Sequence, residues 1–204
     1  NEISLHLGIL KQENYINDDY TLTNKGKISA NIHEVHSQAM ADIIDDGGFE
    51  QLTPEEIVAV VSVFTPIRLS DKDKYINVDY INCNDNIIQT IKKIKKSLNY
   101  WYDIETKHQT SFAQEYNIQY DMCEFMFKWC LAENEEQCIQ IYNEVKGFNI
   151  YIGEFVKAIL KIKNICKELE QACQIKENVS LLNKLSKVPE LILKSIATNQ
   201  SLYL

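Results

Sequence analysis

The sequence has few of the residues that interrupt regular structure. Among its 204 residues there are only 6 glycines and 3 prolines, so tight turns should be rare and the elements long. Hydrophobic residues make up 45% of the chain and charged residues 25%, an ordinary composition for a packed domain. These numbers predict one domain, or one domain with a small appendage, built mainly from helices.

Basic residues are outnumbered, because 21 lysines and arginines face 29 aspartates and glutamates. The formal net charge is -8, and Arg68 is the only arginine. A free-standing nucleic-acid-binding protein is usually basic. Any contact with a polyanion must therefore use a local basic stripe, or charge that another domain supplies.

The six cysteines include no Cys-x-x-Cys pair. Most fall on expected apolar helix faces, which is typical of buried thiols in a reducing compartment. We therefore expect an intracellular location, with the nucleus, the cytoplasm and a viral factory all open. His33 and His36 have a spacing found in zinc sites, but no second pair follows, so zinc is the weaker interpretation and no metal is expected.

Other motifs are missing as well. No apolar run is long enough to span a membrane and no signal peptide is visible, so no membrane partner is expected. There is no phosphate-binding Gly-x-x-x-x-Gly-Lys-[Ser/Thr] loop, no dinucleotide glycine motif and no Ser-His-Asp or Cys-His set. The residues alone indicate a helical binding or regulatory module, and nothing supports a hydrolase.

The N-terminal segment differs in character from the rest of the chain. Residues 1–12 read as a short helix, and the aromatic and β-branched residues of 13–27 predict a two-stranded β-hairpin. A helix followed by a small hairpin resembles the end of a winged-helix module. The expected organisation is a winged-helix-like remnant over residues 1–27 and an all-α helical bundle over residues 28–204.

Capping signals and apolar spacing predict the helices of the bundle. The clearest start is Thr53-Pro54-Glu55-Glu56, where Thr53 and Glu56 can form a capping box. Pro189 should kink or interrupt the last helix. The expected helices cover residues 27–46, a stretch from Thr53 to Thr65, 85–102, two segments that meet near Asn134, 150–174 and about 178–198.

Two helices carry a distinct polar or basic face. Helix 85–102 carries four lysines close together: Lys92, Lys93, Lys95 and Lys96. The simpler interpretation is a solvated face, and the functional interpretation is a basic edge near a phosphate backbone. Helix 150–174 has a polar line opposite its apolar stripe, with Lys163 and Lys167 beside it. This line consists of Lys157, Lys161, Asn164 and Glu168.

Several blocks occur in a characteristic order: "LTNKGKISANI", "GGFEQLTPEEIVAVVSVF", "MCEFMFKWC", "GEFVKAILKIKNICKELEQAC" and the terminal "SLYL". Together they resemble the C-terminal DSHCT domain of the DExH-box RNA helicases that act as cofactors of the RNA exosome. The resemblance covers nearly the whole chain, and it rests on the ordered set rather than on any single block.

The resemblance implies an accessory domain of an ATP-dependent RNA helicase. The ATPase domains, which would bind ATP and Mg, are not in this sequence, so the chain itself is expected to hold no cofactor. The implied partners are single-stranded RNA, those ATPase domains and exosome-type proteins. In the family, one long bundle helix, the ratchet helix, contacts RNA in the channel, and here it corresponds to about residues 150–174.

The family pattern "GxxxRxxxRLEEL" corresponds to residues 153–165, so Lys157 and Lys161 stand at the arginine positions. Each replacement exchanges a bidentate fork for a point charge. The usual Leu-Glu-Glu is Ile162-Lys163-Asn164, and Asn31 replaces an acidic residue of another block. The implied RNA-binding residues are Lys157, Lys161, Asn164 and Glu168.

The chain ends on apolar residues, which is unusual for a free terminus. The resemblance implies that Leu202, Tyr203 and Leu204 fold back into the helicase body as a structural anchor. An alternative stays open, because the net charge of -8 also suits an acidic helical protein-interaction scaffold without RNA contact.

Overall fold

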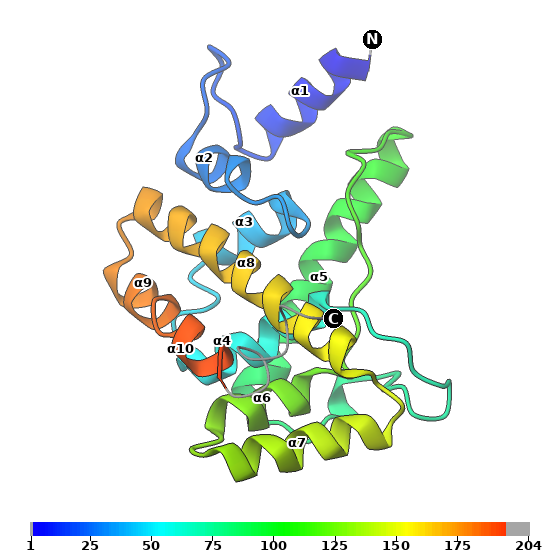
Figure 1. Ribbon diagram of the computed structural model, residues 1–204. Helices are drawn as coiled ribbons and strands as arrows, with labels where there is room; N and C mark the ends of the chain where they lie inside the picture. Colours follow the sequence, from blue (N-terminus) through cyan, green and yellow to red (C-terminus); the bar gives the residue numbers. More distant parts are fainter. Residues whose placement is uncertain (1, 195–204) are drawn as a thin grey trace.

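The computed structural model describes residues 2–194, which form helices joined by irregular segments (Figure 1). No strand occurs in this range, so the all-α fold is confirmed for it. The expected anchor of Leu202, Tyr203 and Leu204 lies outside the described residues. The elements are α1 (Glu2–Gln12), α2 (Asn24–Ala30), α3 (Ser37–Asp45), α4 (Pro54–Val61), η1 (Ser62–Phe64), η2 (Val78–Tyr80), α5 (Asp85–His108), α6 (Cys123–Leu131), α7 (Glu135–Gly147), α8 (Ile152–Lys176), α9 (Val179–Leu185) and α10 (Val188–Ile192).

The predicted β-hairpin over residues 13–27 is wrong. Within this segment the only β-type pairing is a single antiparallel bridge between Ile16 and Leu22. Two paired residues cannot make a stable ribbon without further strands. The segment is instead tied down by Thr23, whose hydroxyl donates to the Asn14 carbonyl at 2.7 Å and whose side chain caps α2. The expected boundary at residues 27 and 28 falls inside α2 and stays a prediction.

The single helix predicted over residues 27–46 is two helices, α2 and α3. Asn31 ends α2, and its side-chain amide donates to the Lys27 carbonyl at 2.8 Å. α3 begins after His36, whose Nδ1 accepts the backbone N–H of Ala39. A side-chain cap competes with helix continuation, so the chain turns between the two caps and exposes the loop at His33.

Helix α4 lies at the centre of the bundle. Its start is the predicted capping box: Thr53 Oγ1 accepts the Glu56 N–H at 3.2 Å, and the Glu56 carboxylate accepts the Thr53 N–H at 2.9 Å. Every residue from 56 to 61 is buried, as expected for a helix covered on all sides. It packs against α5, α6, α8, α9 and α10.

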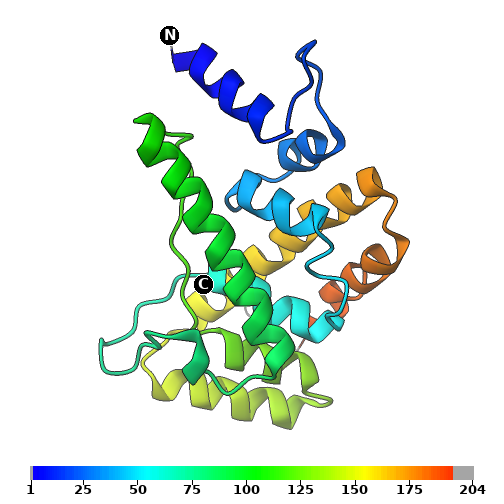
Figure 2. The same ribbon diagram turned by 180° about the vertical axis from the view of Figure 1, so that it is seen from behind.

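The longest helices, α5 and α8, lie on opposite faces of the molecule. α8 crosses the front in Figure 1, and α5 crosses the front in the reverse view of Figure 2. α5 is longer than predicted, because it continues to His108 and stops where Gln109 adopts a left-handed conformation. The segment after it returns along α5 and reaches η1, where the Gln119 N–H donates to the Val63 carbonyl at 2.9 Å.

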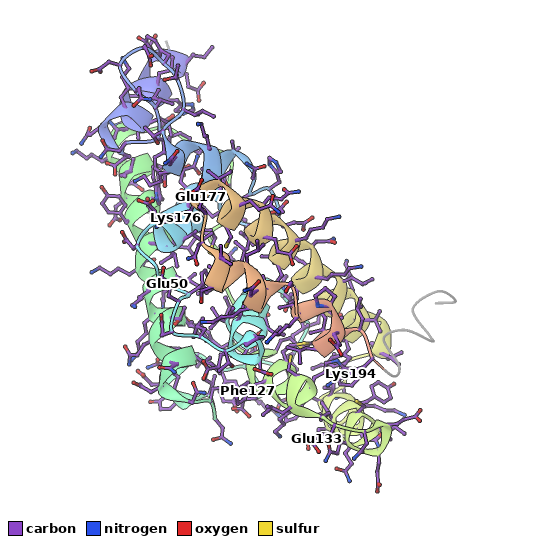
Figure 3. All side chains as sticks on the ribbon, turned by 90° about the vertical axis from the view of Figure 1, so that its left-hand side faces the viewer. Glu50, Phe127, Glu133, Lys176, Glu177 and Lys194 are labelled. Atoms are coloured by element: carbon purple, nitrogen blue, oxygen red, sulfur yellow. The ribbon has the colours of Figure 1, made fainter. Side chains whose placement is uncertain are left out.

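The last described helices pack against α8 and confirm the predicted break near Pro189. Pro189 stands in the first turn of α10, where its missing N–H costs nothing. α10 is held by Trp129 of α6, whose indole N–H donates to the Ile192 carbonyl at 3.0 Å. Lys194 follows and donates to the Ala132 carbonyl at 2.7 Å (Figure 3).

Gly26 provides a stability test of the contact between the N-terminal segment and α2. A Cβ atom at this position would lie 2.0 Å from the Tyr15 carbonyl oxygen. We predict that Gly26→Ala lowers the free energy of unfolding by about 2 kcal/mol, because backbone must move to make room. Chemical denaturation measures this change.

The matched control is Gly8→Ala. Gly8 is an exposed residue of α1, and a Cβ atom there meets nothing within 4 Å. Because alanine is the better helix former, this variant should be up to about 1 kcal/mol more stable. Equal effects of the two substitutions would contradict the packing described for Gly26.

Candidate nucleic-acid interface

Helix α8 is amphipathic, and its apolar side forms one wall of the core. The ring of Phe155 packs edge-on against Trp129, with centroids 5.1 Å apart. The helix lies against α2, α9, α10 and α4. Its buried residues are Phe155, Val156, Ala158, Ile159, Ile162, Ile165, Cys166, Leu169, Ala172 and Cys173.

The structure places the four predicted RNA-binding residues on the side of α8 that faces away from this wall. Lys157 and Asn164 are exposed, and Lys161 and Glu168 are half-buried. Residues spaced by three or four positions share a helix face, so the four side chains form one line. We call these residues the α8 line. Within residues 2–194, neither of its lysines forms an ion pair.

Lys161 lies beside two carboxylates. It lines a small hollow of about 50 Å³ together with Glu34 and Glu115, which come from the α2–α3 loop and from the segment after α5. His36 lines the same hollow but is 1% exposed. Burial lowers the pKa of His36 to about 4, so its ring is neutral at pH 7. The positive charge at this hollow therefore comes from Lys161 alone.

Glu168 has an intramolecular task that its position in the sequence does not reveal. One of its carboxylate oxygens accepts the backbone N–H groups of His33 and Glu34, at 2.9 and 3.0 Å. These groups lie more than 130 residues away in the sequence. Glu168 thus holds the loop between α2 and α3 against α8, and one of its carboxylate oxygens is already engaged.

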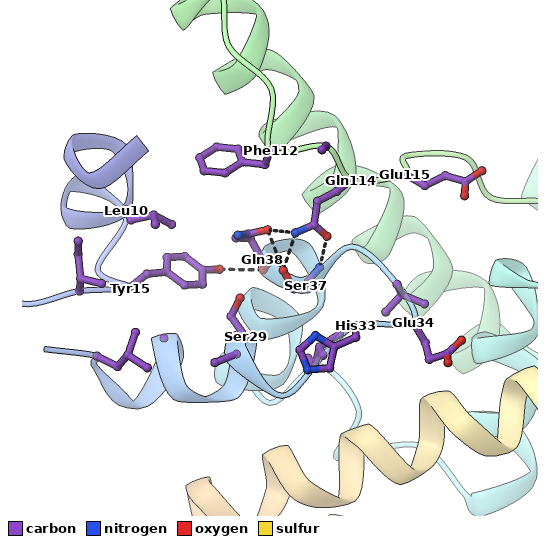
Figure 4. Close-up of a pocket in the computed structure, with 17 residues that line it drawn as sticks. Leu10, Tyr15, Ser29, His33, Glu34, Ser37, Gln38, Phe112, Gln114 and Glu115 are labelled. Atoms are coloured by element: carbon purple, nitrogen blue, oxygen red, sulfur yellow. Dashed lines mark hydrogen bonds between the residues drawn. The ribbon is translucent and has the colours of Figure 1, made fainter. Parts of the chain in front are cut away.

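A larger cavity of about 550 Å³ lies next to the α8 line, between the N-terminal helices and the segment after α5 (Figure 4). Its polar side chains bond to one another: the Gln114 amide donates to Ser37 and Gln38, and the Tyr15 hydroxyl donates to the Gln38 carbonyl. These hydrogen-bonded amides and hydroxyls connect the N-terminal helices to the segment after α5, and they offer no nucleophile–base pair.

The cysteines and histidines do not assemble into a site in the part of the chain that the structure describes. No group of three or more His, Cys, Asp or Glu residues there is arranged to hold a metal ion. His33 is exposed, whereas His36 is buried and caps α3. Five of the six cysteines are buried, as predicted, and burial raises the pKa of Cys130 to about 12.

No helix among residues 2–194 combines the length and the apolar character needed to cross a bilayer.

The contact of Glu168 with the loop predicts different effects along the α8 line. Glu168→Ala should lower the free energy of unfolding by about 1 kcal/mol, because two backbone donors lose their acceptor. Asn164→Ala changes an exposed residue of the same helix and should shift it by less than about 0.5 kcal/mol. Urea unfolding of the two variants compares them, and equal values would contradict the structural role of Glu168.

Comparison with known proteins identifies the domain. Residues 19–199 match the DSHCT (NUC185) domain. The chain is 24% identical over 200 residues to the "Antiviral helicase SKI2" of Saccharomyces cerevisiae, and this match covers 97% of the chain. It is 21% identical to the "DExH-box ATP-dependent RNA helicase DExH11" of Arabidopsis thaliana, and this match covers 97% of the chain. It is 20% identical to the "ATP-dependent RNA helicase mtr4" of Schizosaccharomyces pombe, and this match covers 100% of the chain.

The match is confined to a small part of each relative. It covers 15% of the yeast protein, 14% of the plant protein and 17% of the fission yeast protein. The family match, in contrast, extends over most of the chain described above. The resemblance noted in the sequence is confirmed: this chain belongs to the DSHCT domain family and is similar over its length to the corresponding part of Ski2-like DExH-box RNA helicases.

Proposed function

We propose that this chain is the C-terminal accessory domain of an ATP-dependent DExH-box RNA helicase. In this proposal the domain packs on the ATPase core, and α8 guides single-stranded RNA through the channel. ATP and Mg bind to the ATPase domains and not to this chain. The protein acts inside the cell, and exosome-type proteins are its further partners.

One observation carries the proposal: within residues 2–194, the α8 line faces away from the core along a helix whose other side is embedded in it. From Lys157 to Glu168 the line extends for about 16 Å at 1.5 Å per residue. Lys157 and Lys161 offer point charges to phosphates, and the Asn164 amide offers both a donor and an acceptor. A rigid helix keeps these groups in register while a strand moves past them.

The carboxylates beside the line support a weak and reversible contact. Glu34 and Glu115 lie at the hollow that Lys161 lines, and their charges partly offset the attraction of the lysine for phosphate. A strand that moves during unwinding must be released as well as held. Weak contacts of this kind are salt-sensitive and largely independent of base sequence.

The test is charge reversal in the intact helicase. Lys157→Glu with Lys161→Glu should lower the RNA unwinding rate roughly tenfold, because two attractive contacts become repulsive. ATP hydrolysis without RNA should be unchanged. The two positions are not in the buried face of α8, so the melting temperature of the variant should match that of the parent. A strand-displacement assay measures the rate.

The control is Lys146→Glu, an exposed lysine of α7 that forms no ion pair within residues 2–194. It changes the net charge in the same direction and should leave unwinding at the parental rate. Normal unwinding by the α8 variant would instead favour the alternative function, an acidic protein-interaction scaffold. The net charge of -8 is the observation behind that alternative.

A further inference from the structure

Helix α5 carries the densest positive charge of this acidic chain. Four lysines occur within five positions, at 92, 93, 95 and 96. All four are exposed. Lys92 is paired with Asp79, with Nζ and the carboxylate oxygen 2.6 Å apart. Within residues 2–194, Lys93, Lys95 and Lys96 form no ion pair.

These lysines share one side of the helix, opposite the buried side chains of Ile94 and Trp101. The side is hollowed rather than flat. A groove of about 430 Å³ is lined by Lys92, Lys95, Lys96, Asn99, Tyr100 and Asp103. A second hollow of about 510 Å³ adjoins it, because Lys96 and Tyr100 line both. It adds Lys93, whereas its other lysine, Lys25, is paired with Asp42, and the carboxylates of Glu13 and Asp46 line its far side.

Aromatic rings flank the lysines on both sides. Tyr100 is 49% exposed and Tyr102 is 56% exposed. Both rings are fixed in place: the Tyr100 hydroxyl donates to the Glu13 carboxylate at 2.9 Å, and Tyr102 packs edge-on against Tyr116 with centroids 5.5 Å apart. An exposed ring that is already ordered loses little entropy when a planar ligand stacks on it.

We propose that this side of α5 binds single-stranded RNA. We call it the α5 basic face and define it by Lys93, Lys95, Lys96, Tyr100 and Tyr102. Unpaired lysines in a groove, with exposed aromatic rings beside them, are the features that hold a sugar-phosphate backbone and stack its bases. Bases of a duplex are stacked inside and cannot use the rings. An acidic peptide would use the lysines but has no bases to stack.

This surface is separate from the α8 line. The two helices occupy opposite faces of the molecule (Figures 1 and 2), so one short RNA segment cannot contact both in a straight path. The α5 basic face therefore lies on the side of the domain opposite α8, where it meets a second stretch of RNA. Its existence does not depend on the role proposed for α8.

The experiment measures binding of a fluorescent 20-nucleotide polyuridine RNA to the intact helicase over a range of salt concentrations. Lys93→Gln, Lys95→Gln and Lys96→Gln are combined in one variant. We expect roughly tenfold weaker binding at low salt, and a salt dependence of log K that is shallower by about 2, because about 0.7 counterion is released per phosphate contact. The triple change to Glu should lower the affinity further.

The aromatic part of the proposal has its own variant. Tyr102→Ala should weaken binding of the single strand several-fold without changing its salt dependence, because stacking releases no counterions. A blunt duplex of the same length should bind the variant and the parent equally. A duplex that loses as much affinity as the single strand would overturn the stacking contact.

Matched variants separate this inference from the function proposed above. Combining Lys128→Gln, Lys146→Gln and Lys187→Gln, which are exposed lysines elsewhere, should leave both affinity and salt dependence unchanged. If the α5 variant behaves like this control while the α8 variant loses affinity, the inference is wrong and the proposed function stands. If polyglutamate binds the parent more tightly than the RNA does, and loses that affinity in the α5 variant, the α5 basic face is a site for acidic proteins and the inference is also overturned.

Discussion

The packing of α8 against the rest of the bundle is the interaction on which the structure depends. Its apolar side contributes ten buried residues, and full burial of a large aliphatic or aromatic side chain is worth about 1.5–3 kcal/mol. This one helix packs against α2, α4, α9 and α10. Because the apolar side is buried in the core, the polar side faces outward, and the α8 line lies on the outer side for that reason.

Glu168 links this packing to the candidate site. Its carboxylate holds the backbone of the loop between α2 and α3, and the same loop supplies Glu34 to the hollow beside Lys161. The contact between Glu168 and this loop therefore fixes the charge near Lys161, which lies two turns earlier on the same helix. A change in the loop would alter the charge around that lysine without touching it.

Local signals in the sequence predicted what local interactions decide. The capping box of Thr53 and Glu56 and the polar line at 157, 161 and 164 both follow from spacing within a few turns, and the structure has them. The hairpin over residues 13–27 and the unbroken helix over 27–46 were wrong. Those segments are shaped by partners outside them: the Tyr15 hydroxyl donates to the Gln38 backbone carbonyl, and Glu168 holds His33. No local pattern encodes a contact across 135 positions.

The central claim is that the α8 line contacts RNA in the working helicase. Ultraviolet crosslinking of single-stranded RNA to the intact protein, followed by mapping of the modified peptides, tests it most directly. The account predicts crosslinks within residues 157–164 of α8, and their loss when both lysines of the line are changed to glutamate. Crosslinks in the ATPase domains with none on α8 would contradict it.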